Sequence, residues 1–118
     1  MHKKVVLVAV DVTINEGELE NFKKAASELI SLCDSDPGAL KYEWFLSADQ
    51  KHCRVLEEYV DGDALLAHSA AAGELIQKLW AFCKTDRFEI FGDPGPKITE
   101  MAPQIGAQIF AHWSGLSR

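Results

Sequence analysis

The sequence lacks the charge pattern of a nucleic-acid-binding protein. Its 118 residues include 12 Lys and Arg against 18 Asp and Glu, and the basic residues form no stripe that could neutralise phosphates. It also lacks an apolar run long enough to span a membrane, because Asp11 interrupts the apolar stretch near the N-terminus and no signal cleavage site follows. We therefore expect a single domain that has neither nucleic acid nor a membrane as a partner.

Cysteine pairs and metal-ligand spacings are also missing. Cys33, Cys53 and Cys83 are odd in number, widely spaced and without a Cys-x-x-Cys pair, which argues against a disulfide framework or a structural zinc site. We expect reduced thiols and a cytoplasmic protein. The histidines, His2 included, are not spaced as a metal pair, and no phosphate loop, dinucleotide fingerprint or nucleophile elbow is present. We therefore expect no metal and no cofactor.

Hydrophobic patterning predicts a sequence of alternating strands and helices. Apolar runs and period-two alternation indicate strands, whereas apolar residues at helical spacing behind capping residues indicate helices. The expected strands are residues 5–12, 40–46, 52–60, 87–91 and 107–113, and the expected helices are 17–34, 61–79 and 97–102. The order through residue 91 is β-α-β-β-α-β. This order is typical of an α+β, ferredoxin-like domain with an antiparallel sheet and helices on one of its faces.

The same pattern predicts a division of the chain and a partner. We expect a ferredoxin-fold domain over residues 1–92 and a C-terminal extension, 93–118, packed on that domain or on a partner subunit. The first strand is apolar on both faces, and the second carries large apolar groups on both. Since the helices cover one face only, we expect a homodimer in which two sheets pack face to face about a two-fold axis.

Four short motifs resemble the antibiotic biosynthesis monooxygenase family, the dimeric α+β barrels that include small quinol monooxygenases. They stand in the family's order and spacing: Pro37-Gly38, Tyr42-Glu43, Glu57-x-Tyr59 and Ala64-Leu65-x-x-His68. The resemblance implies a cofactor-independent monooxygenase that acts with dioxygen on a small aromatic or quinol-type substrate. Other members of the family are isomerases, degrade haem or have no demonstrated activity, and fold alone does not choose among them.

The haem-degrading branch of the family is the easiest to test against the residues. Its members use an asparagine on the first strand, a tryptophan on the second helix and, nine residues later, a histidine that ligates iron. The resemblance aligns these positions with Val10, His68 and Gln77. None of the three matches, so we do not expect haem to bind in that way.

His68, Glu57 and Tyr59 are the candidate catalytic residues. Oxygenation without a cofactor needs a base with a near-neutral pKa, and the spacing of His68 from Leu65 places it on the apolar side of its helix. Glu57 and Tyr59 share a strand face, where the carboxylate could orient His68 and the phenol could donate to an oxyanion. The alternatives are a core histidine bonded to a backbone carbonyl or to Glu57, a salt bridge between Glu57 and Arg54 or a lysine, and a core tyrosine.

Tyr42, Trp44 and Trp80 are the candidate substrate-binding residues. Tyr42 and Trp44 share one face of a strand and could form flat walls for an aromatic ligand. Their alternative is ordinary sheet packing or a dimer interface, and that of Trp80 is helix packing. Two further functions stay open on the same fold: a binding protein without turnover, and an isomerase-type enzyme that transfers protons.

Overall fold

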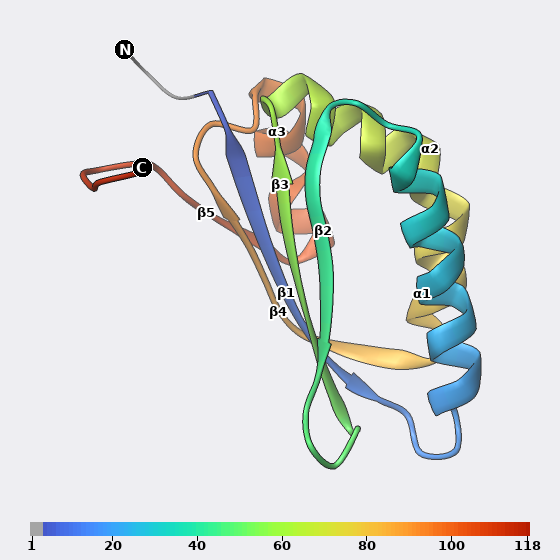
Figure 1. Cartoon of the computed structure of the whole chain (residues 1–118). Helices are drawn as coiled ribbons and strands as arrows, with labels where there is room; N and C mark the ends of the chain where they lie inside the picture. The colour runs from blue at the N-terminus through green and yellow to red at the C-terminus, as the bar shows by residue number, and fades with distance from the viewer. Residues whose placement is uncertain (1–3) are drawn as a thin grey trace.

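In residues 4–118, which the computed structural model describes, the chain folds into a sheet of five strands and three helices (Figure 1). His2 lies outside the described residues. The elements follow in the order β1 (Val6–Ile14), α1 (Leu19–Asp34), β2 (Ala39–Leu46), β3 (His52–Tyr59), α2 (Gly62–Trp80), β4 (Cys83–Phe91), α3 (Pro96–Ile105) and β5 (Ala107–Phe110).

The sheet has the order β2-β3-β1-β4-β5. β1 lies at its centre and pairs antiparallel with β3 and β4, while β2 pairs antiparallel with β3. β5 pairs parallel with β4, to which α3 connects it. The ferredoxin-like α+β fold predicted from the sequence is confirmed, with a parallel strand added at one edge.

β4 begins at Cys83, four residues before the strand predicted from the sequence. Residues 83–86 carry no apolar alternation, yet residues 83–85 pair with the end of β1 beyond a register shift between Asp11 and Val12 that leaves Asp86 unpaired in the ladder. A bulge of this kind bends a strand and lets it extend past its regular ladder. The pairing partner, rather than the local side chains, therefore sets the start of β4.

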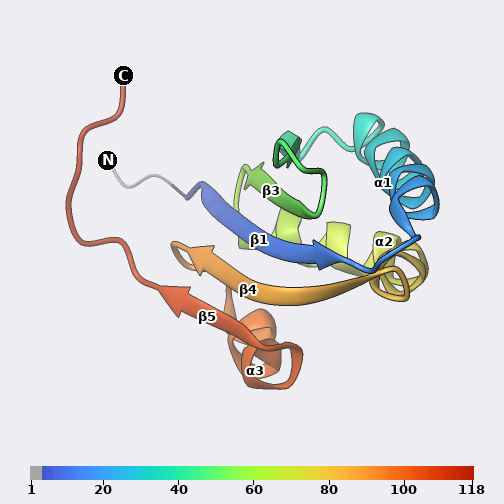
Figure 2. The ribbon, with the colours of Figure 1, turned by 90° about the horizontal axis from the view of Figure 1, so that it is seen from below.

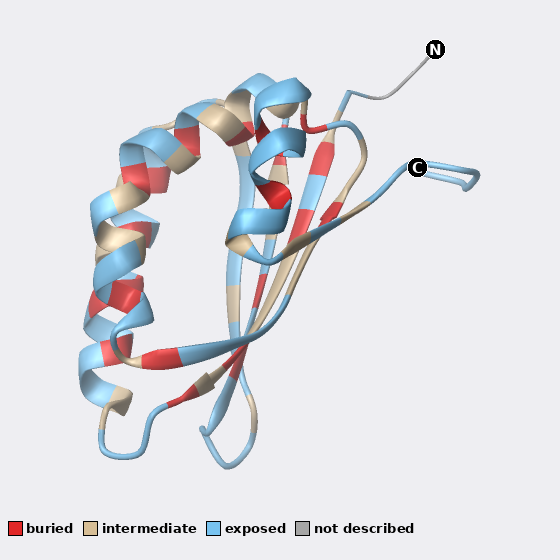
Figure 3. Cartoon of the chain, turned by 180° about the vertical axis from the view of Figure 1, so that it is seen from behind, coloured by how far each residue is buried: buried red, intermediate tan, exposed pale blue. Residues whose placement is uncertain are grey.

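α1 and α2 pack side by side on one face of the sheet (Figures 1 and 2). α1 buries Phe22, Leu29 and Cys33 against the sheet, and α2 buries its own stripe at helical spacing. Asp61 caps α2 by accepting a hydrogen bond from the Ala64 backbone amide at 2.8 Å. The buried residues of α2 are Leu65, His68, Ala72 and Leu79. Figure 3 shows buried and exposed segments alternating along the helices.

Residues 93–110 pack against the rest of the sheet and against α2. Ile98 and Ala102 of α3 are buried, and Ile98 joins the cluster formed by Val6, Tyr59 and Ile90. After β5 the chain continues without regular structure to its C-terminus, where Trp113 is 94% exposed. The first turn of α2 also lies close to this region, since a Cβ on Gly62 would come within 2.6 Å of the Pro94 backbone.

The second face of the sheet carries large apolar side chains that are partly open to solvent. Leu7, Phe45, Leu56 and Phe110 are exposed, and the strand register puts them on the face opposite the helices. Charged residues accompany them, including the ion pair of Arg54 Nε and Asp11 Oδ1 at 2.7 Å. We call these apolar residues the open face. Among residues 4–118, no helix is long and apolar enough to cross a membrane.

Candidate active site

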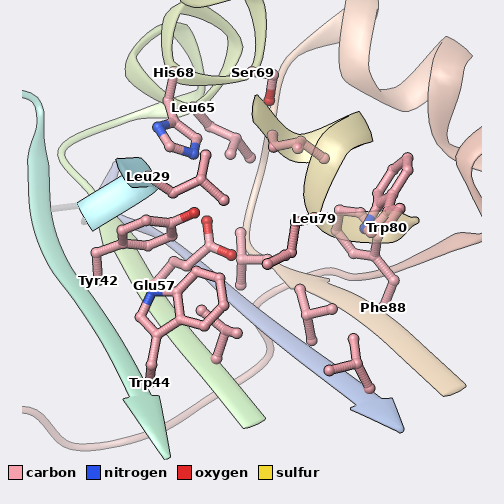
Figure 4. A pocket seen from close by; sticks show the side chains of 15 residues that line it. Leu29, Tyr42, Trp44, Glu57, Leu65, His68, Ser69, Leu79, Trp80 and Phe88 are labelled. Atoms are coloured by element: carbon pink, nitrogen blue, oxygen red, sulfur yellow. The ribbon is translucent and has the colours of Figure 1, made fainter. Parts of the chain in front are cut away.

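A cavity lies between the helices and the sheet, where the two clusters of the core meet (Figure 4). Its volume is about 80 Å³. A buried water needs roughly 10–15 Å³ on this scale, so the cavity has room for several. Most of the wall is apolar and includes Val10, Leu29 and Phe88. The polar groups come from opposite layers, with Glu57 on the sheet and His68 and Ser69 on α2.

Glu57 combines an apolar environment with a single strong hydrogen bond. The Tyr59 hydroxyl, two residues along β3 on the same face, donates to Glu57 Oε1 at 2.5 Å. Burial raises the pKa of Glu57 from its ordinary value of 4.5 to about 7, and the bond from Tyr59 offsets only part of that rise. The carboxyl group can therefore give up or take a proton near physiological pH.

Tyr59 contacts Glu57 from the side away from the cavity. Its side chain is fully buried, and it is absent from the wall of the cavity. Burial raises the pKa of Tyr59, and the nearby Glu57 carboxylate raises it further, so the phenol stays protonated and remains a donor. The geometry thus lets Tyr59 orient and stabilise the carboxylate.

Three side chains surround the ring of His68, which is 5% exposed. Cys33 Sγ of α1 lies 3.3 Å from His68 Nδ1. The rings of Tyr42 and Tyr59 approach it with centroid distances of 5.2 and 5.3 Å. Burial lowers the pKa of His68, so the imidazole is neutral at pH 7. The ring is held in one orientation at the edge of the cavity (Figure 4).

Tyr42 and Trp44 form the β2 side of the cavity. Their rings meet edge to face at a centroid distance of 5.5 Å, and Trp44 packs in the same way on Phe22 of α1 at 6.0 Å. Figure 4 shows the Tyr42 hydroxyl and the Glu57 carboxyl turned toward the same part of the cavity. Burial raises the pKa of Tyr42, with a further contribution from Glu57. Trp44 Nε1 is buried and has no hydrogen-bond partner within residues 4–118.

Five of the six side chains named from the sequence line this one cavity: Tyr42, Trp44, Glu57, His68 and Trp80. The alternative of an ion pair between Glu57 and Arg54 is wrong, because Arg54 lies on the opposite face of β3 and binds Asp11. The alternative of a dimer interface for Tyr42 and Trp44 is also wrong, because both face the helices.

Sequence reasoning missed Ser69 and the contact of Cys33 with His68. Ser69 directly follows His68 on α2 and lines the cavity. Cys33 stands at helical spacing on the apolar side of α1, where it resembles an ordinary core residue. No local signal joins it to His68, since that contact depends on how α1 and α2 pack. In the part of the chain that the structure describes, no group of three or more His, Cys, Asp or Glu could hold a metal ion.

Comparison with known proteins places this geometry in a family. The sequence profile of the family described as "Antibiotic biosynthesis monooxygenase" matches residues 5–73, more than half of the chain. That segment contains β1 to β3, the first part of α2, and the residues Cys33, Tyr42, Glu57 and His68. No curated protein matches the chain at a significant level.

Solved structures with the same fold come from several bacteria. The crystal structure of MupZ from Pseudomonas fluorescens matches with a TM-score of 0.80 and 26% identity, over 98% of this chain and 95% of MupZ, so the match extends into α3 and β5. SnoaB, a cofactor-independent oxygenase from Streptomyces nogalater, matches with a TM-score of 0.66 and 16% identity, over 79% of this chain and 96% of SnoaB. A protein of unknown function from Bacteroides thetaiotaomicron matches with a TM-score of 0.68 and 22% identity, over 76% and 98% of the two chains.

The structures that are 22% and 16% identical to the chain show only that the fold is shared. The sequence profile is what identifies the family. The profile covers β1 to β3, α1 and the first part of α2, which supply most of the cavity wall, whereas the end of α2 and β4 supply the rest. The chain belongs to the antibiotic biosynthesis monooxygenase family.

Proposed function

We propose that the protein is a cofactor-independent monooxygenase of a small aromatic or quinol-type molecule, with Glu57 as the group that takes the substrate proton. The observation that carries this proposal is a carboxyl group with a pKa of about 7 in the wall of an apolar cavity. A general base is most effective when its pKa lies near the working pH. Family membership and the fold shared with SnoaB support the oxygenase chemistry.

Dioxygen reacts directly with an organic molecule when that molecule supplies the electrons. In the proposed reaction Glu57 removes a proton from a CH₂ group between aromatic rings, and the resulting carbanion gives electrons to O₂ and forms a C–O bond. One oxygen atom ends in the new carbonyl group. The other leaves as water with the two hydrogens that the carbon has lost, so CH₂ and O₂ become C=O and H₂O. The substrate is both the reductant and the acceptor of oxygen.

The remaining side chains support this step in different ways. Tyr59 holds the Glu57 carboxyl in place through its 2.5 Å hydrogen bond. Tyr42 and Trp44 provide flat walls for an aromatic ring, and Trp80 closes the cavity near Phe88. A bound substrate would displace water from the apolar cavity and so protect the reactive carbanion, which would otherwise be protonated again.

Oxygen uptake with dithranol, a hydroxylated anthrone, tests the proposal. We expect the protein to consume one O₂ for each anthrone converted to the quinone, above the rate of spontaneous oxidation. Glu57→Gln keeps the shape and the acceptor for Tyr59 but cannot take a proton, so kcat should fall about 100-fold or more. Glu58→Gln is the matched control, because Glu58 lies on the opposite face of β3 and should retain the parent rate. Equal rates for the parent and Glu57→Gln would contradict the proposal.

A second candidate is an isomerase that moves a proton without oxygen. A near-neutral carboxyl group with phenol and imidazole groups around it has all that abstraction of a proton next to a carbonyl requires. Exchange of deuterium into a ketone under anaerobic conditions, lost in Glu57→Gln, would favour this candidate. Tight binding of dithranol with neither oxygen uptake nor exchange would favour a binding protein without turnover.

The working form that we propose is a cytoplasmic homodimer. The open face supports the dimer, since Leu7, Phe45 and Leu56 are too exposed for an isolated sheet and a second copy would cover them. The three cysteines are free and buried, which fits a reducing compartment. In the same proposal residues 1–92 form the family domain, and 93–118 extend its sheet edge and continue as the tail.

A further inference from the structure

The contact between Cys33 and His68 is the part of the site that the proposed function leaves unused. Cys33 Sγ lies 3.3 Å from His68 Nδ1, and both side chains are buried. Tyr42 and Tyr59 flank the imidazole at centroid distances of 5.2 and 5.3 Å, so the ring cannot turn over without moving one of them. Nδ1 is therefore held against α1. Figure 4 shows one ring nitrogen on the side of Tyr42 and Glu57.

The partners of the three thiols indicate which atom donates in this contact. Cys83 Sγ donates to the Leu79 carbonyl oxygen at 3.6 Å, and Cys53 Sγ to the Arg54 carbonyl oxygen at 3.9 Å. Cys33 has no such carbonyl bond among the described residues, so His68 Nδ1, 3.3 Å away, is the acceptor available to its thiol proton. A protonated thiol can donate a hydrogen bond, and the unprotonated nitrogen of a neutral imidazole can accept it.

Both groups are neutral at physiological pH. Burial raises the pKa of the Cys33 thiol to about 11, with smaller contributions from Glu57 and Asp36. Burial lowers the pKa of His68, while Asp36 opposes the change. A neutral imidazole carries one proton, and if Nδ1 accepts the hydrogen bond from Cys33 that proton lies on Nε2.

We propose that Cys33 is a positioning residue that fixes His68 as the Nε2–H tautomer, so that His68 donates a hydrogen bond to a ligand oxygen while Glu57 takes the proton. This inference deepens the proposed function and rests on it, because the oxygen becomes negative as Glu57 deprotonates the ligand. It changes the role of His68 from the base expected on sequence to a donor. It also favours ligands that place a carbonyl or phenol oxygen next to the acidic C–H, since charge then develops where Nε2–H can stabilise it.

The ¹⁵N spectrum of the imidazoles tests the tautomer without ligand or turnover. At pH 7.5 we expect the His68 signals, assigned by their loss in His68→Gln, to show the Nε2–H form alone. Cys33→Ala removes the donor and should introduce a fraction of Nδ1–H, whereas Cys33→Ser keeps a donor and should restore the parent spectrum. Cys83→Ala is the matched control, because that thiol bonds to a backbone carbonyl. An Nδ1–H form in the parent, or an unchanged spectrum in Cys33→Ala, would overturn the inference.

Steady-state kinetics with dithranol then connect the tautomer to the reaction. We expect Cys33→Ala to lower kcat about tenfold and to change KM by no more than about twofold, and we expect Cys33→Ser to recover most of kcat. The reason is that the hydrogen bond from His68 Nε2–H stabilises the negative ligand oxygen of the transition state more than it stabilises the neutral bound substrate. A loss of kcat in Cys33→Ser as large as in Cys33→Ala would overturn the positioning role. Absence of turnover in the parent would instead contradict the proposed monooxygenase, and the imidazole spectrum would still decide the tautomer.

Discussion

Burial of the Glu57 carboxyl affects the stability of the fold as well as its chemistry. In the unfolded chain this group loses its proton near pH 4.5, but in the folded protein it keeps the proton until about pH 7. The folded state therefore binds more protons between these pH values, and stability falls as pH rises through that window. His68, whose pKa burial lowers, acts in the opposite direction near its ordinary value of 6.5. The contribution of Glu57 is best measured as a difference between variants that share His68.

Glu57→Gln should become more stable relative to the parent as pH rises from 5 to 8. Glutamine cannot ionise but still accepts the hydrogen bond from Tyr59, so the cost of a buried charge disappears. The change between the two pH values should be about 2 kcal/mol in the free energy of unfolding, below the full value of the pKa shift. Urea unfolding at fixed protein concentration measures it, with Glu58→Gln as the control. A pH-independent difference between parent and Glu57→Gln would show that Glu57 titrates normally.

Single residues of the site were predictable from the sequence where one element placed them. Strand alternation put Glu57 and Tyr59 on one face, and helical spacing put His68 on the apolar side of α2. The Cys33 contact and the position of Tyr59 behind Glu57 were not predictable, because both depend on distances between elements. The near-neutral pKa of Glu57 was not predictable either, because it results from burial between the sheet and the helices, which the residues next to Glu57 in the sequence do not indicate.

At the scale of elements, α2 places His68 at the cavity, and the contacts of its first turn determine where the helix begins. Asp61 caps the helix, and Gly62 lets that turn approach the Pro94 backbone. The sequence predicted the order of elements and the start of α2 from its capping residue. It did not predict the start of β4, because residues 83–85 join the sheet through pairing with β1 rather than through their own propensity.

Gly62→Ala should destabilise the protein, whereas Gly73→Ala in the same helix should stabilise it. A Cβ on Gly62 would lie 2.6 Å from the Pro94 carbonyl carbon and oxygen, while a Cβ on Gly73 would meet nothing within 4 Å. We expect a loss of about 1–3 kcal/mol for the first change and a gain of about 0.5–1 kcal/mol for the second. Urea unfolding of the two variants provides the measurement. A neutral Gly62→Ala would mean that the turn before α3 yields freely.

At the scale of the whole molecule, the two faces of the sheet differ in their exposure to solvent. The helices cover one face and enclose the cavity, while the open face presents Leu7, Phe45, Leu56 and Phe110. Arg54 and Asp11 pair among these apolar side chains. A monomer would leave this mixed surface in water, whereas a two-fold partner would bury it and would form every contact between two different residues twice.

Leu56→Arg should convert the proposed dimer to a monomer. Leu56 lies on β3 opposite Ala9 of β1 and Glu43 of β2, inside the open face, and an arginine there would put unpaired charge into the interface. Sedimentation at micromolar concentration should give a dimer for the parent and a monomer for the variant. Met101→Arg, a similarly exposed position on α3, should remain dimeric. A folded monomer of the parent chain would refute the dimer.

The burial of all three cysteines also decides how the protein can be labelled. Cys33, Cys53 and Cys83 are each 9% exposed or less, and burial raises the pKa of each thiol to about 11. Maleimides react with the thiolate, which is scarce at neutral pH for such groups. A cysteine introduced at an exposed position therefore accepts a fluorophore or spin label on the natural background, and the thiol that contacts His68 need not be removed first.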